Sequence, residues 1–140
     1  MKKSYLLIAL LTLSSCSDSP DDEKREINTV VLKDLIQHTK EFEKRVYSYE
    51  NGLHIAVGYG IANSIMVEGV GGNIIIDASD SVAEAEEVYS HFKKINSNPI
   101  TAIIYTHNHG DHTFGAAYYY NLNEEKPMVI AHESTSHYVE

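Results

Sequence analysis

Four side chains that can bind a metal lie within six positions of one another in this chain. His107, His109, Asp111 and His112 form the pattern H-x-H-x-D-H. Neutral imidazole and carboxylate are the usual non-sulfur ligands of zinc, at about 2.0–2.2 Å from the ion. Because the first two histidines are two residues apart, they can point to one side and share an ion. The sequence therefore predicts a metal site at this motif.

The second half of the motif indicates a second metal position. Gly110 has no Cβ and tolerates unusual φ, so the chain can turn and direct Asp111 and His112 towards another ion. Two ions about 3.5–4 Å apart can bridge a water molecule and lower its pKa towards 7, which produces hydroxide at neutral pH. Asp111 would then bind a metal and also orient that hydroxide. The alternative is a loop of solvated or mutually hydrogen-bonded histidines without metal.

Buried strands should hold this motif in place. Residues 100–106 (ITAIIYT) predict a buried strand that runs directly into it, and α/β folds place ligand sites beyond the C-terminal ends of their strands. Residues 74–76 are all isoleucine, which predicts a second strand that is buried on both faces. That strand ends at Asp77, near the expected position of the metal loop.

The remaining elements complete a layered α/β fold. Apolar residues at helical spacing predict helices over 27–45 and 81–95, the second with a capping box formed by Ser81 and Glu84. Asn51-Gly52 is a strong hairpin signal. The other strands are expected over residues 46–50, 53–57, 63–70, 73–77 and 128–131. This order predicts a mixed sheet covered by helices.

The segment Thr106–Ala116, THNHGDHTFGA, resembles the metal loop of the metallo-β-lactamase superfamily. Upstream, Ala62–Gly69 and Gly72–Asp77 resemble the strands that precede the loop in that superfamily. The Ala-Asn and Glu-Gly steps are similar to the alkylsulfatase branch, whose members hydrolyse alkyl sulfate esters. The chain departs from the pattern at Ala116, where many relatives have a second glycine.

The resemblance implies the N-terminal half of an αβ/βα sandwich and a centre with two zinc ions, bound by His107, His109, Asp111 and His112. It also implies that Asp77 supports these ligands without binding metal. The alternative for Asp77 is a residue that only forms the turn after its strand. The ligands that the superfamily supplies from later strands have no match here. Residues 27–140 are therefore expected to be a partial domain, truncated at its C-terminus and inactive alone.

The N-terminus has the features of an export signal. Lys2 and Lys3 precede the apolar run Tyr5–Leu13, which is too short to remain as a membrane span. Leu13-Ser14-Ser15-Cys16 resembles a bacterial lipobox, so residues 1–15 are expected to be removed and Cys16 to carry lipid. Polar residues 16–26 would form a flexible tether. The protein would then be a membrane-anchored lipoprotein facing the periplasm or cell exterior. The alternative is an ordinary cleaved signal with a chance cysteine.

Composition excludes some classes of function and of covalent cross-link. The formal charge of -9 argues against a nucleic-acid groove, and a single cysteine excludes an internal disulfide. The leading hypothesis is a zinc hydrolase that attacks an alkyl sulfate or other ester through metal-bound hydroxide. The alternatives are a metallo-β-lactamase that opens lactam rings and a non-catalytic, metal-binding lipoprotein. His38 and His54 are expected to be packing residues.

Overall fold

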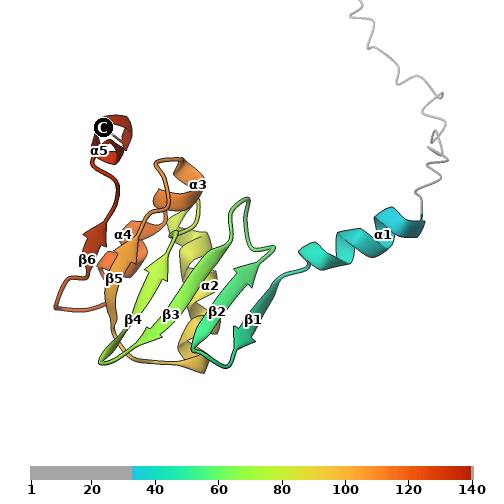
Figure 1. Ribbon diagram of the computed structural model, residues 1–140, viewed down its shortest axis with the longest axis horizontal. Coiled ribbons are helices and arrows are strands. Elements are labelled where there is room, and N and C mark those ends of the chain that lie inside the picture. Colours follow the sequence, from blue (N-terminus) through green and yellow to red (C-terminus); the bar gives the residue numbers. More distant parts are fainter. Residues whose placement is uncertain (1–32, 140) are drawn as a thin grey trace, which may run out of the picture. The chain divides into compact units, whose positions relative to one another are not determined.

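The computed structural model describes residues 33–139, so the expected signal, Cys16 and the tether lie outside the described part. Six strands form one mixed sheet in the order β1-β2-β3-β4-β5-β6 (Figure 1). The strands are β1 (Arg45–Tyr49), β2 (Leu53–Val57), β3 (Ser64–Gly69), β4 (Gly72–Ile76), β5 (Ile100–Ile104) and β6 (Met128–Ile130). The expected α/β class with a mixed sheet is confirmed.

Strand direction changes at the middle of the sheet. β1 to β4 pair antiparallel, whereas β4 pairs parallel with β5 and β5 parallel with β6. The β1–β2 hairpin turns at Asn51-Gly52 as predicted, and Gly52 adopts φ of 74°, which glycine accommodates without a steric penalty. The parallel half places the C-terminal ends of β4 and β5 at the same edge.

Helix α2 (Val82–Ile95) crosses from β4 to β5, and its bounds agree with the prediction to within one residue. The Ser81 hydroxyl accepts a hydrogen bond from the Glu84 amide at 3.2 Å, which caps the helix. The other described helices are short: α1 (Lys33–Thr39), the 3-10 turn η1 (Lys40–Phe42), α3 (Gly110–Thr113), α4 (Ala116–Tyr120) and α5 (Thr135–Val139). No helix was predicted at α3 or α4, because each is too short to show helical periodicity.

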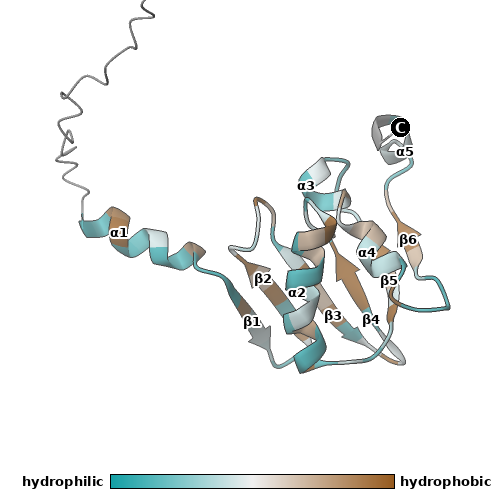
Figure 2. Cartoon of the chain, turned by 180° about the vertical axis from the view of Figure 1, so that it is seen from behind, coloured by the Kyte–Doolittle hydropathy of each residue, from teal (hydrophilic) through white to brown (hydrophobic). Residues whose placement is uncertain are grey.

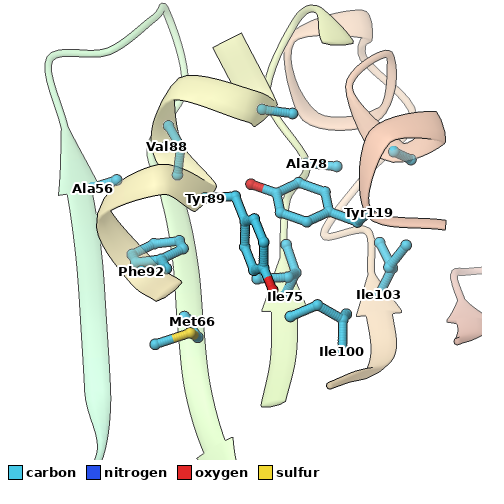
Figure 3. Packing of buried hydrophobic residues seen from close by; sticks show 12 residues of the cluster. Ala56, Met66, Ile75, Ala78, Val88, Tyr89, Phe92, Ile100, Ile103 and Tyr119 are labelled. Atoms are coloured by element: carbon cyan, nitrogen blue, oxygen red, sulfur yellow. The ribbon is translucent and has the colours of Figure 1, made fainter. Parts of the chain in front are cut away.

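The core lies between the sheet and helices α2 and α4. Val88 and Phe92 of α2 and Tyr119 of α4 pack against Met66 and Ile75, with at most 1% of each side chain exposed (Figure 3). Figure 2 views the molecule from the helical side and shows α2 and α4 in front of the sheet, with strand β4 coloured as apolar. This packing fixes β4 and β5, the two strands that lead to the metal loop.

The opposite face of the sheet is not covered by any helix that the structure describes. Alternation along β4 places Ile75 in the core and leaves Ile74 and Ile76 only half-buried on the other face. The prediction that residues 74–76 are buried on both faces is therefore wrong for the described chain. The half-buried residues of this face are Ile55, Ile65, Val67, Ile74, Ile76, Ala102 and Ile104.

Helix α1 also differs from expectation. The predicted helix over 27–45 is described from Lys33 and ends at Thr39, and a 3-10 turn follows it. Its apolar stripe is not buried: 55% of Leu35 and 62% of Phe42 are exposed. The prediction that His38 is a packing residue is wrong, because the side chain is exposed and contacts Glu41 at 3.1 Å. Within residues 33–139, no helix is long and apolar enough to cross a membrane.

Candidate metal centre

The H-x-H-x-D-H motif lies at the sheet edge where two parallel strands end. β5 ends at Ile104, and residues 105–109 form the loop before α3, in which His109 is the N-cap residue. β4 ends beside it at Ile76 and is followed by Asp77. The loop therefore follows β5 directly and runs past the end of β4 (Figure 1).

The structure brings the four motif side chains together. The ring centroid of His107 lies 4.6 Å from that of His109 and 4.0 Å from that of His112. His112 Nε2 lies 3.3 Å from Asp111 Oδ2. Asp111 and His112 stand on the first turn of α3, which begins within the motif and turns the chain back towards the first two histidines.

The four side chains contact one another, but they do not form a complete metal site. Among residues 33–139, no group of three His, Cys, Asp or Glu side chains has a geometry that could hold a metal ion. His107 lies beside both His109 and His112, and Asp111 lies beside His112. If His107 and His109 served one ion and Asp111 and His112 another, each ion would receive two ligands here, whereas zinc usually takes four. The donor types suit zinc, but further ligands would have to come from outside this part of the chain.

Asp77 connects the metal loop to the end of β4. Only 5% of its surface is exposed. Its Oδ1 accepts a hydrogen bond from the Thr106 amide at 2.9 Å, and its Oδ2 accepts one from the Thr106 hydroxyl at 2.8 Å. The same Oδ2 lies 2.8 Å from His112 Nδ1, at ion-pair distance. One buried carboxylate thus contacts residues on both sides of the motif.

The backbone around Asp77 is held equally firmly. Its amide donates to the Ile104 carbonyl at 2.9 Å, and its carbonyl accepts the Ser64 hydroxyl at 2.6 Å. The next amide, of Ala78, donates to the His112 carbonyl at 2.7 Å. Asp77 and Ser79 have φ of 59° and 73°, a conformation that costs non-glycine residues free energy. These contacts hold that strained turn against the metal loop.

The hydrogen bonds around Thr106 define which nitrogen of His107 can face a metal. The Thr106 hydroxyl donates its only proton to Asp77, so at its 3.1 Å contact with His107 Nδ1 it acts as acceptor. His107 Nδ1 then carries the proton, and Nε2 keeps the lone pair that binds a metal. Sequence reasoning did not single out Thr106, although its place directly before the first histidine was a usable signal.

The backbone role expected for Gly110 is not seen. Its φ is not positive, so unusual backbone conformation does not explain the glycine. A Cβ at this position would lie 2.5 Å from the Phe114 ring, so a side chain here would require that ring to move. Phe114 is itself 65% exposed beside the motif. This aromatic neighbour of the loop was also missed in the sequence.

Comparison with known proteins gives one matching family description. A family model described as the metallo-beta-lactamase superfamily matches residues 57–137, which include the whole motif and Asp77. A linear primary-alkylsulfatase from a Pseudomonas species is 46% identical over 50 residues, which cover 36% of this chain. The chain spans about a tenth of the length of that curated relative (10%).

Solved structures show the same fold. The stereoselective inverting sec-alkylsulfatase Pisa1 from Pseudomonas sp. superposes with a TM-score of 0.51 at 26% identity, over 54% of this chain and 12% of that one. The metallo-beta-lactamase FIM-1 from Pseudomonas aeruginosa, in its mono-zinc form, gives 0.54 at 17% identity. That alignment covers 69% of this chain and 45% of the lactamase.

Proposed function

The chain belongs to the metallo-beta-lactamase superfamily, and from this membership we propose that it forms part of a zinc-dependent hydrolase. In this proposal His107 and His109 bind one zinc ion, while Asp111 and His112 bind a second. The zinc ions would supply Lewis-acid activation of a water molecule, which gives a nucleophile at neutral pH.

The observation that carries the proposal is the fixed orientation of the imidazoles. Thr106 accepts from Nδ1 of His107, and the buried Asp77 carboxylate lies 2.8 Å from Nδ1 of His112, so Nε2 is the nitrogen of each ring that remains for a metal. Metal-binding histidines in proteins usually donate their other ring nitrogen in this way. A loop of merely solvated histidines has no need for a buried carboxylate behind it.

The contact between His112 and Asp111 supports a cation at this position. His112 Nδ1 lies 2.8 Å from Asp77 Oδ2, and His112 Nε2 lies 3.3 Å from Asp111 Oδ2, so a carboxylate oxygen lies near each ring nitrogen. Carboxylates and imidazole together are ligands that suit a zinc ion. Because histidine binds zinc in its neutral form, we expect zinc binding to weaken as the pH falls.

Zinc titration of the full chain tests the ligand assignment. We expect His107→Ala and His112→Ala each to lower zinc affinity by at least about tenfold, because each removes one of few ligands. His38→Ala is the matched control, since it removes an exposed histidine far from the motif in sequence. Competition with a chromophoric chelator measures the affinity. Equal affinities for all three variants would contradict the assignment.

For the substrate we propose an alkyl sulfate or another ester. Support comes from the local identity of 46% to a linear primary-alkylsulfatase and from the fold shared with a sec-alkylsulfatase. The second candidate is a β-lactam, because a metallo-beta-lactamase shares the fold as well.

We propose that the chain alone hydrolyses neither, since its motif supplies only two ligands to each ion. A protein in which this segment is joined to the missing ligands should hydrolyse dodecyl sulfate faster than nitrocefin; the reverse order would favour the lactamase.

We also propose that the protein is exported and anchored through a lipid on Cys16. The basis is the sequence of residues 1–26, which lie outside the described structure. Cell fractionation of wild type and Cys16→Ser tests this. The wild type should sediment with membranes and the variant should become soluble. A variant that still sediments with membranes would contradict lipid anchoring at Cys16.

A further inference from the structure

A second set of reactive groups lies on β1, β2 and β3, at the opposite end of the strands from the metal loop. Ser48 and His54 are cross-strand partners in the β1–β2 hairpin, and Glu68 lies near the end of the neighbouring strand β3. β3 begins at Ser64, whose side chain bonds to Asp77 beside the metal loop, so Glu68 is at the far end of that strand. None of the three contacts the zinc ligands.

The three side chains form one hydrogen-bonded line. His54 Nδ1 lies 2.9 Å from the Ser48 hydroxyl, and His54 Nε2 lies 2.8 Å from Glu68 Oε1. His54 is 4% exposed, as expected for a packing residue, whereas Ser48 is exposed at the hairpin. The line therefore runs from the hydroxyl of an exposed serine, through a buried imidazole, to a carboxylate.

The charge of Glu68 determines which group donates the proton in each of these two hydrogen bonds. The hydrogen bond from His54 lowers the pKa of Glu68, so at neutral pH this side chain is ionised and can only accept. His54 Nε2 must then carry the proton that it donates to Glu68. In a neutral imidazole this leaves the lone pair on Nδ1, so the Ser48 hydroxyl is the donor in their contact.

Hydrogen bonding alone would satisfy a buried imidazole, as buried polar groups generally require. Two features go beyond that requirement. Ser48 is an exposed residue, and its hydroxyl contacts a base whose other nitrogen is held by a carboxylate. This is the arrangement in which a serine is activated as a nucleophile.

We propose that Ser48, His54 and Glu68 form a second reactive site, in which Ser48 is a base-activated nucleophile for acyl electrophiles. The Ser48 Oγ–carbon bond forms as its proton passes to His54 Nδ1, and the bond from the acyl carbon to its leaving group breaks. The leaving group departs with the bonding electron pair and takes up the proton. His54 is the general base, and Glu68 is a positioning residue that keeps the proton on Nε2.

A fluorophosphonate probe tests the site on the full chain, with no metal added. It mimics the acyl electrophile: a Ser48 Oγ–phosphorus bond forms, the phosphorus–fluorine bond breaks and fluoride leaves. We expect Ser48 to be labelled about 100-fold faster than Ser90, as general base catalysis typically provides. Ser90 is the internal control, an exposed serine bonded only to a carbonyl of its own helix. Peptide mass spectrometry locates and quantifies both labels.

Variants separate a reactive site from a structural one. His54→Gln should lower the labelling rate of Ser48 to that of Ser90. In this variant the labelling rate of Ser48 should keep rising with hydroxide concentration, whereas the wild-type rate should reach a plateau. Glu68→Gln can donate to Nε2 and reverse the tautomer, so it should also slow labelling. Circular dichroism checks that the variants fold.

A measurement on the wild type alone completes the test. ¹⁵N NMR of His54 should show the tautomer protonated at Nε2. Equal labelling of Ser48 and Ser90, or a His54 protonated at Nδ1, would overturn the proposal. Either result would leave the proposed zinc site unaffected, since neither measurement involves the metal loop.

Discussion

At the scale of single residues, Asp77 connects the end of β4 to both sides of the metal loop. Its carboxylate accepts both polar protons of Thr106 and contacts His112, although sequence reasoning could equally assign it to a simple turn. A turn residue would need neither the burial nor the contact with a histidine. We therefore propose that Asp77 supports the ligands without binding metal, as the family resemblance implies.

Replacing this carboxylate should weaken zinc binding without removing a ligand. Asp77→Asn keeps the size of the side chain but loses the negative charge that lies 2.8 Å from Nδ1 of His112. Such supporting partners typically contribute about 10–100-fold in metal affinity, so we expect a loss in that range. Chelator competition at pH 7.5 measures it, with Asp34→Asn of the exposed helix α1 as control. Unchanged affinity in Asp77→Asn would show that Asp77 only forms the turn.

At the scale of elements, the start of α2 holds the helix cap Ser81 and two interacting carboxyl groups, those of Asp80 and Glu84. Ser81 caps the helix as predicted, but the side chain of Glu84 lies against Gly60 of the β2–β3 connection. Burial, followed by the hydrogen bond and charge of Asp80, raises the pKa of Glu84 to about 7. Periodicity predicted the helix, whereas this contact depends on how the β2–β3 connection meets it.

This pair predicts a pH dependence of folding. The folded-state pKa of Glu84 lies above its ordinary value of 4.5, so the folded chain retains a proton that the unfolded chain releases. Stability from this group is therefore complete below pH 4.5 and is lost as the pH rises towards 7.

Glu84→Gln removes the titration and should be more stable than wild type above pH 7. The gain should be less than about 1 kcal/mol, because solvent screens this partly exposed pair. Urea unfolding at pH 5 and pH 8 measures the difference, and Glu86→Gln, an exposed residue of the same helix, is the control. The change in unfolding free energy from pH 5 to pH 8 is compared between the two proteins. If that free energy rises more in the wild type than in Glu84→Gln, this account is contradicted.

At the scale of the whole described part, the sheet has one packed face and one open face. Ile75 points into the layer beneath α2, while its neighbour Ile74 points to the side that no described helix covers. The two residues share strand, type and neighbours in sequence. They therefore provide a direct comparison of what each face contributes.

The two isoleucines should respond differently to truncation. Ile75→Ala leaves a cavity in a close-packed layer and should cost about 3 kcal/mol of unfolding free energy. Ile74→Ala removes a half-exposed side chain and should cost about 1 kcal/mol. Urea denaturation of both variants at one pH measures the contrast. Equal losses would mean that the open face is covered in solution, for example by another chain.

The sequence by itself determined the local features of this protein. Asn51-Gly52 specified a hairpin, helical spacing specified α2, and the histidine motif after β5 indicated metal chemistry, because each depends on residues close together in the chain. Residues far apart could not be paired in this way. Only the tertiary structure shows that Asp77 meets Thr106 and His112, that His54 connects Ser48 with Glu68, and that Ile74 lies on an open face. The physical reason is that sheet order and the position of α2 decide which distant side chains meet, and local patterns do not encode that choice.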